Sequence, residues 1–256
     1  LIAVSDTARA PQSISGATAF GAVSVEMQAL ADLDPNLAAS TKLSALNNGR
    51  GVTPGQVVIG DGVTMVTIDL TLAEDVADLT ARINADLAAA GLDISIAING
   101  PPNVPADADR FVLTRLGGGP LEARDLDGGR TARDLGIVTP GVVVVPPAPI
   151  GFVGTDVDPR VTGDTLLASL LPGGAPLDLS GITIVNSADV PPPPPTPIPF
   201  AGLTTVDELL FAINSSNTSV IAEINEAGTA IDVRSTLSGG RMTIGENGGT
   251  TAAQMG

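Results

Sequence analysis

Two eleven-residue stretches decide the fold of this chain: EDVADLTARIN at residues 74–84 and TTVDELLFAIN at residues 204–214. Both carry aliphatic residues at helical spacing, and both end in the pair Ile-Asn. Because such spacing places the aliphatic side chains on one face, each stretch predicts an amphipathic helix. The shared motif residues are Ile83, Asn84, Ile213 and Asn214.

Three further blocks recur in the same order around these helices. DLDPNLAASTKLSAL at residues 32–46 resembles DVDPRVTGDTLLASL at residues 156–170 without a gap. After the helices, DRFVLTR matches TAIDVRS, and GGRTARDLG matches GGTTAAQMG at residues 248–256. Four blocks in one order indicate a duplication rather than chance similarity.

The duplication sets the expected domain boundaries. Residues 1–31 have no counterpart and are expected to form a lead-in segment or the end of a preceding unit. A first repeat is expected at residues 32–145, and a second at residues 156–256. The segment between them, residues 146–155, is predicted to be a proline-rich linker.

Each repeat predicts an α+β unit of β-β-α-β-β order, with one helix packed on a small, mainly antiparallel sheet. In the first repeat, two strands are expected around the turn at Gly60-Asp61-Gly62, and Thr71 with Glu74 fits a capping box that opens the helix. The second repeat differs at residues 190–199, where five consecutive prolines predict a stiff, projecting polyproline II loop.

The composition excludes several classes of function. The formal net charge of −16 disfavours contact with nucleic acid or anionic membranes. The chain has no Cys and no His, so thiol chemistry and the commonest general base and metal ligands are missing. The longest apolar stretch is interrupted by Pro140 and Pro146, so no transmembrane segment is expected.

The block of helix, Ile-Asn, two strands and GG-x-TA-x-x-(Leu/Met)-Gly resembles the hook IN motif of flagellins and flagellar hook-associated proteins. This resemblance implies an extracellular structural subunit of the bacterial flagellum, exported without a cleaved signal peptide, and the hook–filament junction protein is the favoured member. Its expected partners are other hook-associated proteins and flagellin. Assembly is expected to use long terminal helices that this fragment does not contain.

Paired carboxylates offer a candidate metal site. Such clustered oxygens suit calcium, but neighbouring prolines favour turns in which the Asp side chains bond the backbone. The calcium candidates are Asp32, Asp34, Asp156 and Asp158. If they bind calcium, an extracellular adhesin-like repeat array stiffened by the cation is the alternative function.

No enzyme or cofactor is expected from the sequence. No serine has a histidine partner, and no G-x-S-x-G motif is present. A glycosidase-type pair of carboxylates remains open by composition alone, but the chain has no Trp or Tyr to stack on a sugar ring. Asn84 and Asn214 are expected to hold neighbouring backbone, with a partner contact as the alternative.

Overall fold

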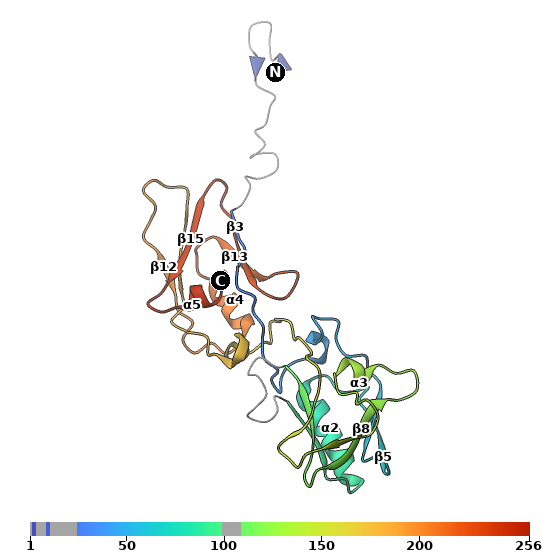
Figure 1. Ribbon diagram of the computed structural model, residues 1–256. Helices are drawn as coiled ribbons and strands as arrows, with labels where there is room; N and C mark the ends of the chain where they lie inside the picture. Colours follow the sequence, from blue (N-terminus) through green and yellow to red (C-terminus); the bar gives the residue numbers. More distant parts are fainter. Residues whose placement is uncertain (1, 4–8, 11–24, 99–108) are drawn as a thin grey trace.

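The computed structural model describes residues 2–3, 9–10, 25–98 and 109–256, and these residues form an α+β protein with two separate apolar cores. The first core is built mainly from residues 37–157, and the second from residues 161–255 together with Leu33. We refer to the structure around them as the first half and the second half. Figure 1 shows them as two lobes, the first in green and the second in orange and red.

The first half contains two small antiparallel sheets, one helix of 14 residues and short helical turns. Its elements in chain order are η1 (Leu43–Ala45), β4 (Gln56–Gly60), β5 (Met65–Asp69), α2 (Val76–Ala89), β6 (Ile94–Ile98), β7 (Phe111–Arg115), β8 (Gly119–Asp125), α3 (Thr131–Asp134), β9 (Val143–Val145) and β10 (Gly151–Val153). One sheet has the order β5-β4-β8-β9 and the other β10-β7-β6.

With the addition of one short helix, η3, the second half repeats this order of elements up to its last short helix. Its elements are η2 (Leu167–Ser169), η3 (Pro172–Gly174), β11 (Ile182–Ser187), β12 (Thr196–Ile198), α4 (Val206–Asn214), β13 (Val220–Ile224), β14 (Ile231–Ser235), β15 (Arg241–Glu246) and α5 (Thr251–Gln254). The sheets have the orders β12-β11-β15 and β13-β14-β3, where β3 is Glu26–Met27 from the start of the chain. A further short pair joins β1 (Ile2–Ala3) to β2 (Arg9–Ala10).

Each half has two sheets where one sheet was predicted. The reason lies in the pairing of β4, whose two edges are taken by β5 and by β8. The hairpin of β6 and β7 therefore has no free edge of β4 to join and forms its own sheet. In the second half β11 is likewise flanked by β12 and β15.

The two longer helices have the predicted apolar faces, but one of them begins later than expected. In α2 the residues Val76, Leu79, Ile83 and Leu87 are all buried. Its N-cap is Asp75, whose side chain accepts from the Asp78 N–H, rather than Thr71. Thr71 instead bonds Asp69 at the end of β5, because a β-strand end leaves that carboxylate free to form a local turn.

The chain crosses between the two cores twice. Leu33 is buried in the second core and Leu37 in the first, whereas Val157 is buried in the first core and Val161 in the second. The first half is therefore one continuous stretch inserted between two pieces of the second half. In Figure 1 the blue strand β3 accordingly lies among the orange and red elements.

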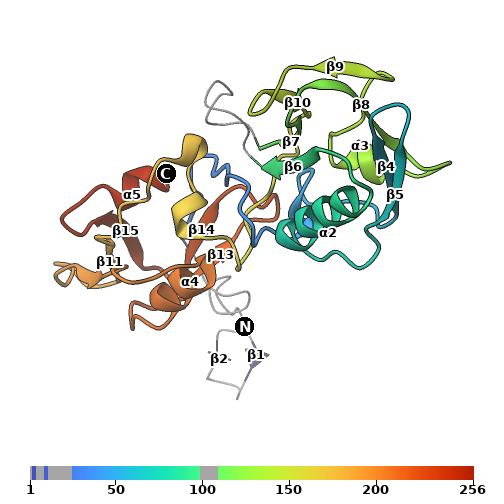
Figure 2. The same cartoon turned by 90° about the horizontal axis from the view of Figure 1, so that it is seen from below.

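A closing strand completes the second sheet of each half. The N-terminal segment predicted as a lead-in supplies β3, which pairs with β14. The segment predicted as a linker, residues 146–155, instead contains β10, which pairs with β7 through Phe152 opposite Leu113. This segment pairs with β7 instead of forming a free linker, because β7 offers an edge for pairing and Phe152 packs against the first core. Figure 2 shows β10 and β9 together on the first half.

The proline-rich loop is exposed from Pro191 to Pro195. The strand after it, β12, keeps the predicted phase, because Ile198 and Phe200 are buried in the second core. These two residues match Ile68 and Leu70 of the first half, which are also buried. The prolines therefore lengthen one hairpin without changing the face that the following strand turns to the core.

Candidate functional site

The Asn of the Ile-Asn motif fastens the helix to the strand that follows it. The Asn84 side chain donates from Nδ2 to the Ile96 carbonyl (3.0 Å) and accepts at Oδ1 from the Ile96 N–H (2.8 Å). Asn214 makes the same two bonds with the backbone of Ala222 (3.0 and 2.6 Å). Each side-chain amide therefore satisfies the backbone N–H and carbonyl of one residue in the edge strand β6 or β13, as a neighbouring strand would.

The Ile of the motif faces the core. Ile83 is fully buried in the first core, and Ile213 is 1% exposed in the second. Because Asn follows the buried Ile by one residue, the two side chains point about 100° apart around the helix. The Ile packs into the core and the Asn reaches the edge strand. The Ile-Asn pair therefore fixes how closely the helix packs on the sheet and where it lies along the strand.

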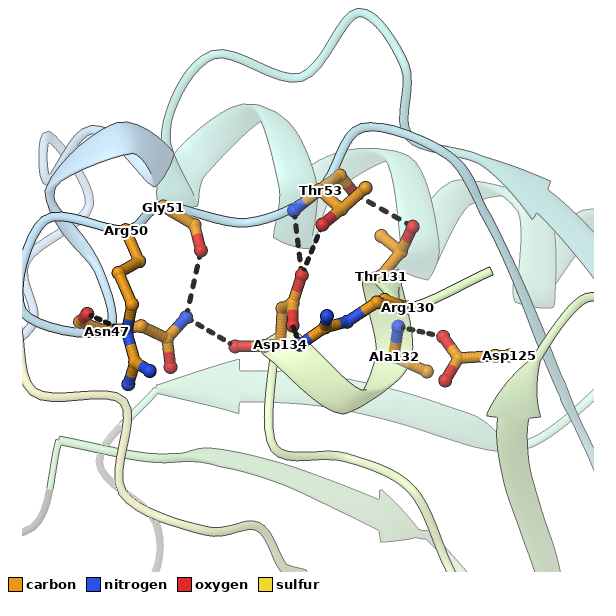
Figure 3. Close-up of polar contacts among 9 residues, drawn as sticks. All are labelled: Asn47, Arg50, Gly51, Thr53, Asp125, Arg130, Thr131, Ala132 and Asp134. Atoms are coloured by element: carbon orange, nitrogen blue, oxygen red, sulfur yellow. Dashed lines mark hydrogen bonds and ion pairs between the residues drawn. The ribbon is translucent and has the colours of Figure 1, made fainter. Parts of the chain in front are cut away.

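The second recurring block, GG-x-TA, anchors the loop before the first strand of each half. Figure 3 shows Thr131 of α3 donating to the Thr53 carbonyl (2.9 Å), and the Ala132 N–H donating to the Asp125 carboxylate (2.7 Å). In the second half Thr251 donates to the Asp178 carbonyl (2.6 Å), and the Ala252 N–H donates to Glu246 (3.0 Å). An acidic side chain at the end of β8 or β15 thus holds the short helix through its N-terminal N–H groups.

In the first half a polar network surrounds Asp134, as drawn in Figure 3. The Asp134 carboxylate accepts from the N–H and the hydroxyl of Thr53 (3.0 and 2.6 Å) and lies 3.7 Å from the Arg130 guanidinium. The Asn47 amide donates to the carbonyls of Gly51 and Asp134 (3.1 and 2.9 Å). All these groups bond to neighbouring loops of the protein itself.

A buried carboxyl, Asp109, lies where the chain crosses between the halves. It is 2% exposed and accepts a hydrogen bond from the Leu37 N–H. Burial, together with the nearby charges of Asp34, Asp156 and Asp158, raises the pKa of Asp109 to about 7, although the hydrogen bond from the Leu37 N–H lowers it. The pKa of Asp158 is also raised, first by burial and then by Asp156.

The four calcium candidates, Asp32, Asp34, Asp156 and Asp158, lie at the two crossovers, and two of them, Asp156 and Asp158, bond each other in a turn. The Asp158 N–H donates to the Asp156 side chain (3.1 Å), and Asp158 has a positive φ of 32°. Asp156 also lies 4.0 Å from the Arg110 guanidinium. In the described part of the chain, no three of the acidic residues gather in a geometry that could hold a metal ion.

Other shifted carboxyls follow the same turn chemistry. The backbone N–H groups of Ser180 and Thr250 lower the pKa of Asp178 to about 2. The backbone of Thr64 and of Val63 lowers the pKa of Asp61 in the β4–β5 turn. Such shifts arise from capping and not from a paired acid and base in a cleft, so they do not indicate catalysis.

The sequence did not single out Asp109 or Asp178. A signal for Asp109 was present, because the residue 120 positions later is Thr229 and an acid facing a Thr breaks the repeat pattern. Asp178 corresponds in the structure to Thr53, since both accept at their backbone carbonyl from the Thr of the GG-x-TA block. That correspondence depends on spacing within loops and could not be aligned from the sequence.

Over the residues described, the structure has no helix that is both long and apolar enough to span a membrane. Comparison of the chain with protein-family models, with curated proteins and with solved structures returned no significant match.

Proposed function

We propose that this chain is a non-enzymatic structural module of the bacterial flagellum, in the surface-exposed region of a hook-associated or flagellin-like subunit. The observation that carries the proposal is the double use of the Ile-Asn motif. Asn84 and Asn214 each make the same pair of backbone hydrogen bonds in the two halves. This geometry gives a physical reason for the motif through which the sequence resembles the hook IN family.

We further propose that the two halves are tandem copies of one β-β-α-β-β unit, extended at its end by a third strand and a short helix. Equivalent backbone bonds support this. The Leu33 N–H donates to the Thr229 carbonyl (2.6 Å), and the Val157 N–H donates to the Asp109 carbonyl (2.9 Å). The donors are 124 positions apart and the acceptors 120, as in the aligned sequence blocks.

The side chains of the recurring blocks support a structural role. Asn, Thr and acidic residues that recur in both halves bond to nearby backbone, as Thr131 and Thr251 do. A catalytic side chain, by contrast, must keep a polar atom that a substrate can approach. An acidic surface suits a subunit that stays soluble during export and then faces the medium.

In this proposal the partners are other hook-associated proteins and flagellin, and assembly runs through long helices of the complete subunit. The module itself projects from the assembled surface. Its two cores, which are filled by Val, Ile and Leu, keep it folded without disulfides.

Antibodies raised against this chain test the proposal by immunogold electron microscopy of intact cells of the source bacterium. We expect gold particles on the flagellum, concentrated at the hook–filament junction. Flagella sheared from the cells and purified should carry the antigen in the same place. Label spread over the cell body, with bare flagella, would contradict the flagellar role.

A further inference from the structure

One residue, Asp109, bonds to both segments that cross between the two halves. These crossing segments are residues 33–37 and residues 157–161. The Asp109 carboxyl accepts a hydrogen bond from the Leu37 N–H, at the end of the first crossing segment. The Asp109 carbonyl accepts from the Val157 N–H (2.9 Å), at the start of the second. Asp109 therefore ties both crossing segments to the chain just before β7.

The second half keeps the backbone bond at this place but not the carboxyl. Thr229 accepts at its carbonyl from the Leu33 N–H (2.6 Å), as Asp109 does from the Val157 N–H. The Thr229 side chain is neutral, and its N–H donates to the Asn225 side chain (2.9 Å). The second half therefore folds without an ionisable group here, so the carboxyl of Asp109 belongs to the connection and not to the repeated unit.

The surroundings of Asp109 favour its neutral form. Its side chain is 2% exposed, and burial is the largest cause of its raised pKa. Asp34 in the first crossing segment, and Asp156 and Asp158 at the second, also raise the pKa, whereas the bond from the Leu37 N–H lowers it. With a pKa of about 7, the carboxyl keeps its proton in most folded molecules below neutral pH.

The arginines near the crossing segments contact other groups. The Arg110 guanidinium lies 4.0 Å from Asp156, and the charge of Arg50 acts on Asp158. Among the described residues, no basic side chain forms an ion pair with Asp109. The other charged residues of these parts of the chain are Asp32, Asp107 and Arg160, of which Asp107 lies outside the described residues. A charged Asp109 therefore faces three acids without an ion pair of its own.

A charged carboxyl at this place gains water if the crossing segments separate. The bonds between the halves include those from the Asn36 N–H to the Ser169 carbonyl (2.8 Å) and from the Arg160 N–H to the Ala45 carbonyl (2.9 Å). The two cores are separate, and neither Asn36 nor Arg160 belongs to one of them. These bonds can therefore break while both cores stay packed.

We propose that Asp109 makes the connection between the two halves sensitive to pH: its protonated side chain holds the crossing segments together, and its carboxylate loosens them while each half stays folded. The inference does not rest on the flagellar role.

The direction of the effect follows from proton binding. In the closed connection the pKa of Asp109 is about 7, whereas in an opened connection the carboxyl returns to water, where its ordinary pKa is 3.8. The closed form therefore binds more protons between these two values. Opening becomes more favourable as the pH rises from about 4 to about 7, and it levels off above that range.

Amide hydrogen exchange of the full chain tests the proposal, followed by NMR and corrected for the intrinsic exchange rate at each pH. The reporters are the amides bonded at the connection: Asn36, Leu37, Val157 and Arg160. Their protection should fall by up to about tenfold per pH unit between about pH 5 and pH 7, and level off above that. Amides in β4 and β14 should stay more strongly protected at every pH.

Three variants assign the effect to Asp109. Asp109→Asn should remove most of the pH dependence, because the amide oxygen still accepts from the Leu37 N–H without carrying a charge. Asp189→Asn, at an exposed position, should keep the pH dependence of the parent. Asp34→Asn retains Asp109 and removes one of the charges that act on it, so protection above neutral pH should be several-fold higher than in the parent.

Three results would overturn the proposal. The first is protection of the four reporter amides that does not change with pH. The second is the same fall in Asp109→Asn as in the parent. The third is exchange of the reporters at the same protection as the amides of β4 at every pH, because Asp109 would then affect the unfolding of the first half as a whole and not the connection between the halves.

Discussion

The two halves reach nearly the same fold by different closures. The first half is closed by the chain that follows it, through β9 and β10, and the second is closed by β3 from the chain that precedes the first. Apart from η3, the elements between the closures follow the same order in both halves, and Asn84 and Asn214 make the same bonds. The difference teaches that a repeated sequence specifies its own elements, whereas the strand that completes them is set by whichever segment lies within reach.

The largest expected effect concerns Asp109, which the second half replaces with Thr229. The pKa of Asp109 is near 7 in the folded chain and 3.8 is its ordinary value, so the folded state binds an extra proton between these values. Stability should therefore fall as the pH rises from 4 to 7, by up to about 4 kcal/mol. Urea unfolding at several pH values measures the slope.

Asp109→Asn should remove most of that slope, because the amide oxygen can still accept from the Leu37 N–H without carrying a charge. The variant should be more stable than the parent at pH 7.5. Asp158, whose pKa is also raised, leaves a smaller residual slope of the same sign. Asp189→Asn, at an exposed position, serves as the control. An unchanged slope in Asp109→Asn would show that the crossover carries no buried charge.

Because the N-terminal segment contributes β3 and Leu33 to the second half, a residue near the start of the chain is expected to stabilise the second half. Leu33 is 2% exposed and belongs to the second core, so Leu33→Ala should destabilise the second half by about 3 kcal/mol. Hydrogen exchange should speed up in β13 and β14 and much less in β6 and β7. Val157→Ala should show the opposite distribution, because Val157 lies in the first core.

Leu30→Ala is the matched control for the Leu33 variant, since the Leu30 side chain is 93% exposed. It should leave exchange unchanged in both halves. Faster exchange in β6 and β7 of Leu33→Ala would mean that the N-terminal segment closes the first half instead.

The next effect is expected to be equal in the two halves. Asn84→Ala should leave the N–H and carbonyl of Ile96 without their partner, at a cost of about 2 kcal/mol. Asn214→Ala should cost a similar amount through Ala222. Thermal unfolding of both variants, compared with exposed Asp189→Ala, tests this symmetry. A large cost for only one of the two would break the equivalence of the motifs.

The smallest effect is expected from calcium. A cation that binds only the native state raises the unfolding midpoint, but the turn residues Asp156 and Asp158 already bond each other. Millimolar calcium should therefore change the midpoint no more than magnesium does. A rise of several degrees with calcium alone would favour the adhesin-like array.

Local patterns predicted the elements well. Amphipathic helices were expected at the two Ile-Asn stretches, and the structure has α2 and α4 there with their aliphatic residues buried. Two strands were expected around the turn at Gly60-Asp61-Gly62, and β4 and β5 pair there, with a φ of 82° at Gly62. Aliphatic spacing and glycine conformation are properties of a few adjacent residues, so a sequence reveals them directly.

The closures could not be predicted in this way. Nothing within residues 25–33 indicates that Met27 pairs with Val233, about two hundred positions away. Residues 146–155 resembled a linker because their prolines hide the short strand β10. Asp109 was missed for a related reason, since its burial depends on segments that meet only after both crossovers form. Long-range pairing is decided by competition among edges, which no local pattern records.

The paired crossovers also affect how the chain would respond to a twist. Beads joined by a single strand can swivel about that strand, but here two chain segments join the lobes, near Asn36 and near Arg160. The Asn36 N–H bonds the Ser169 carbonyl (2.8 Å), and the Arg160 N–H bonds the Ala45 carbonyl (2.9 Å). Rotating one lobe against the other would wind these two segments around each other. The connection between the lobes therefore resists torsion more than a single linker would.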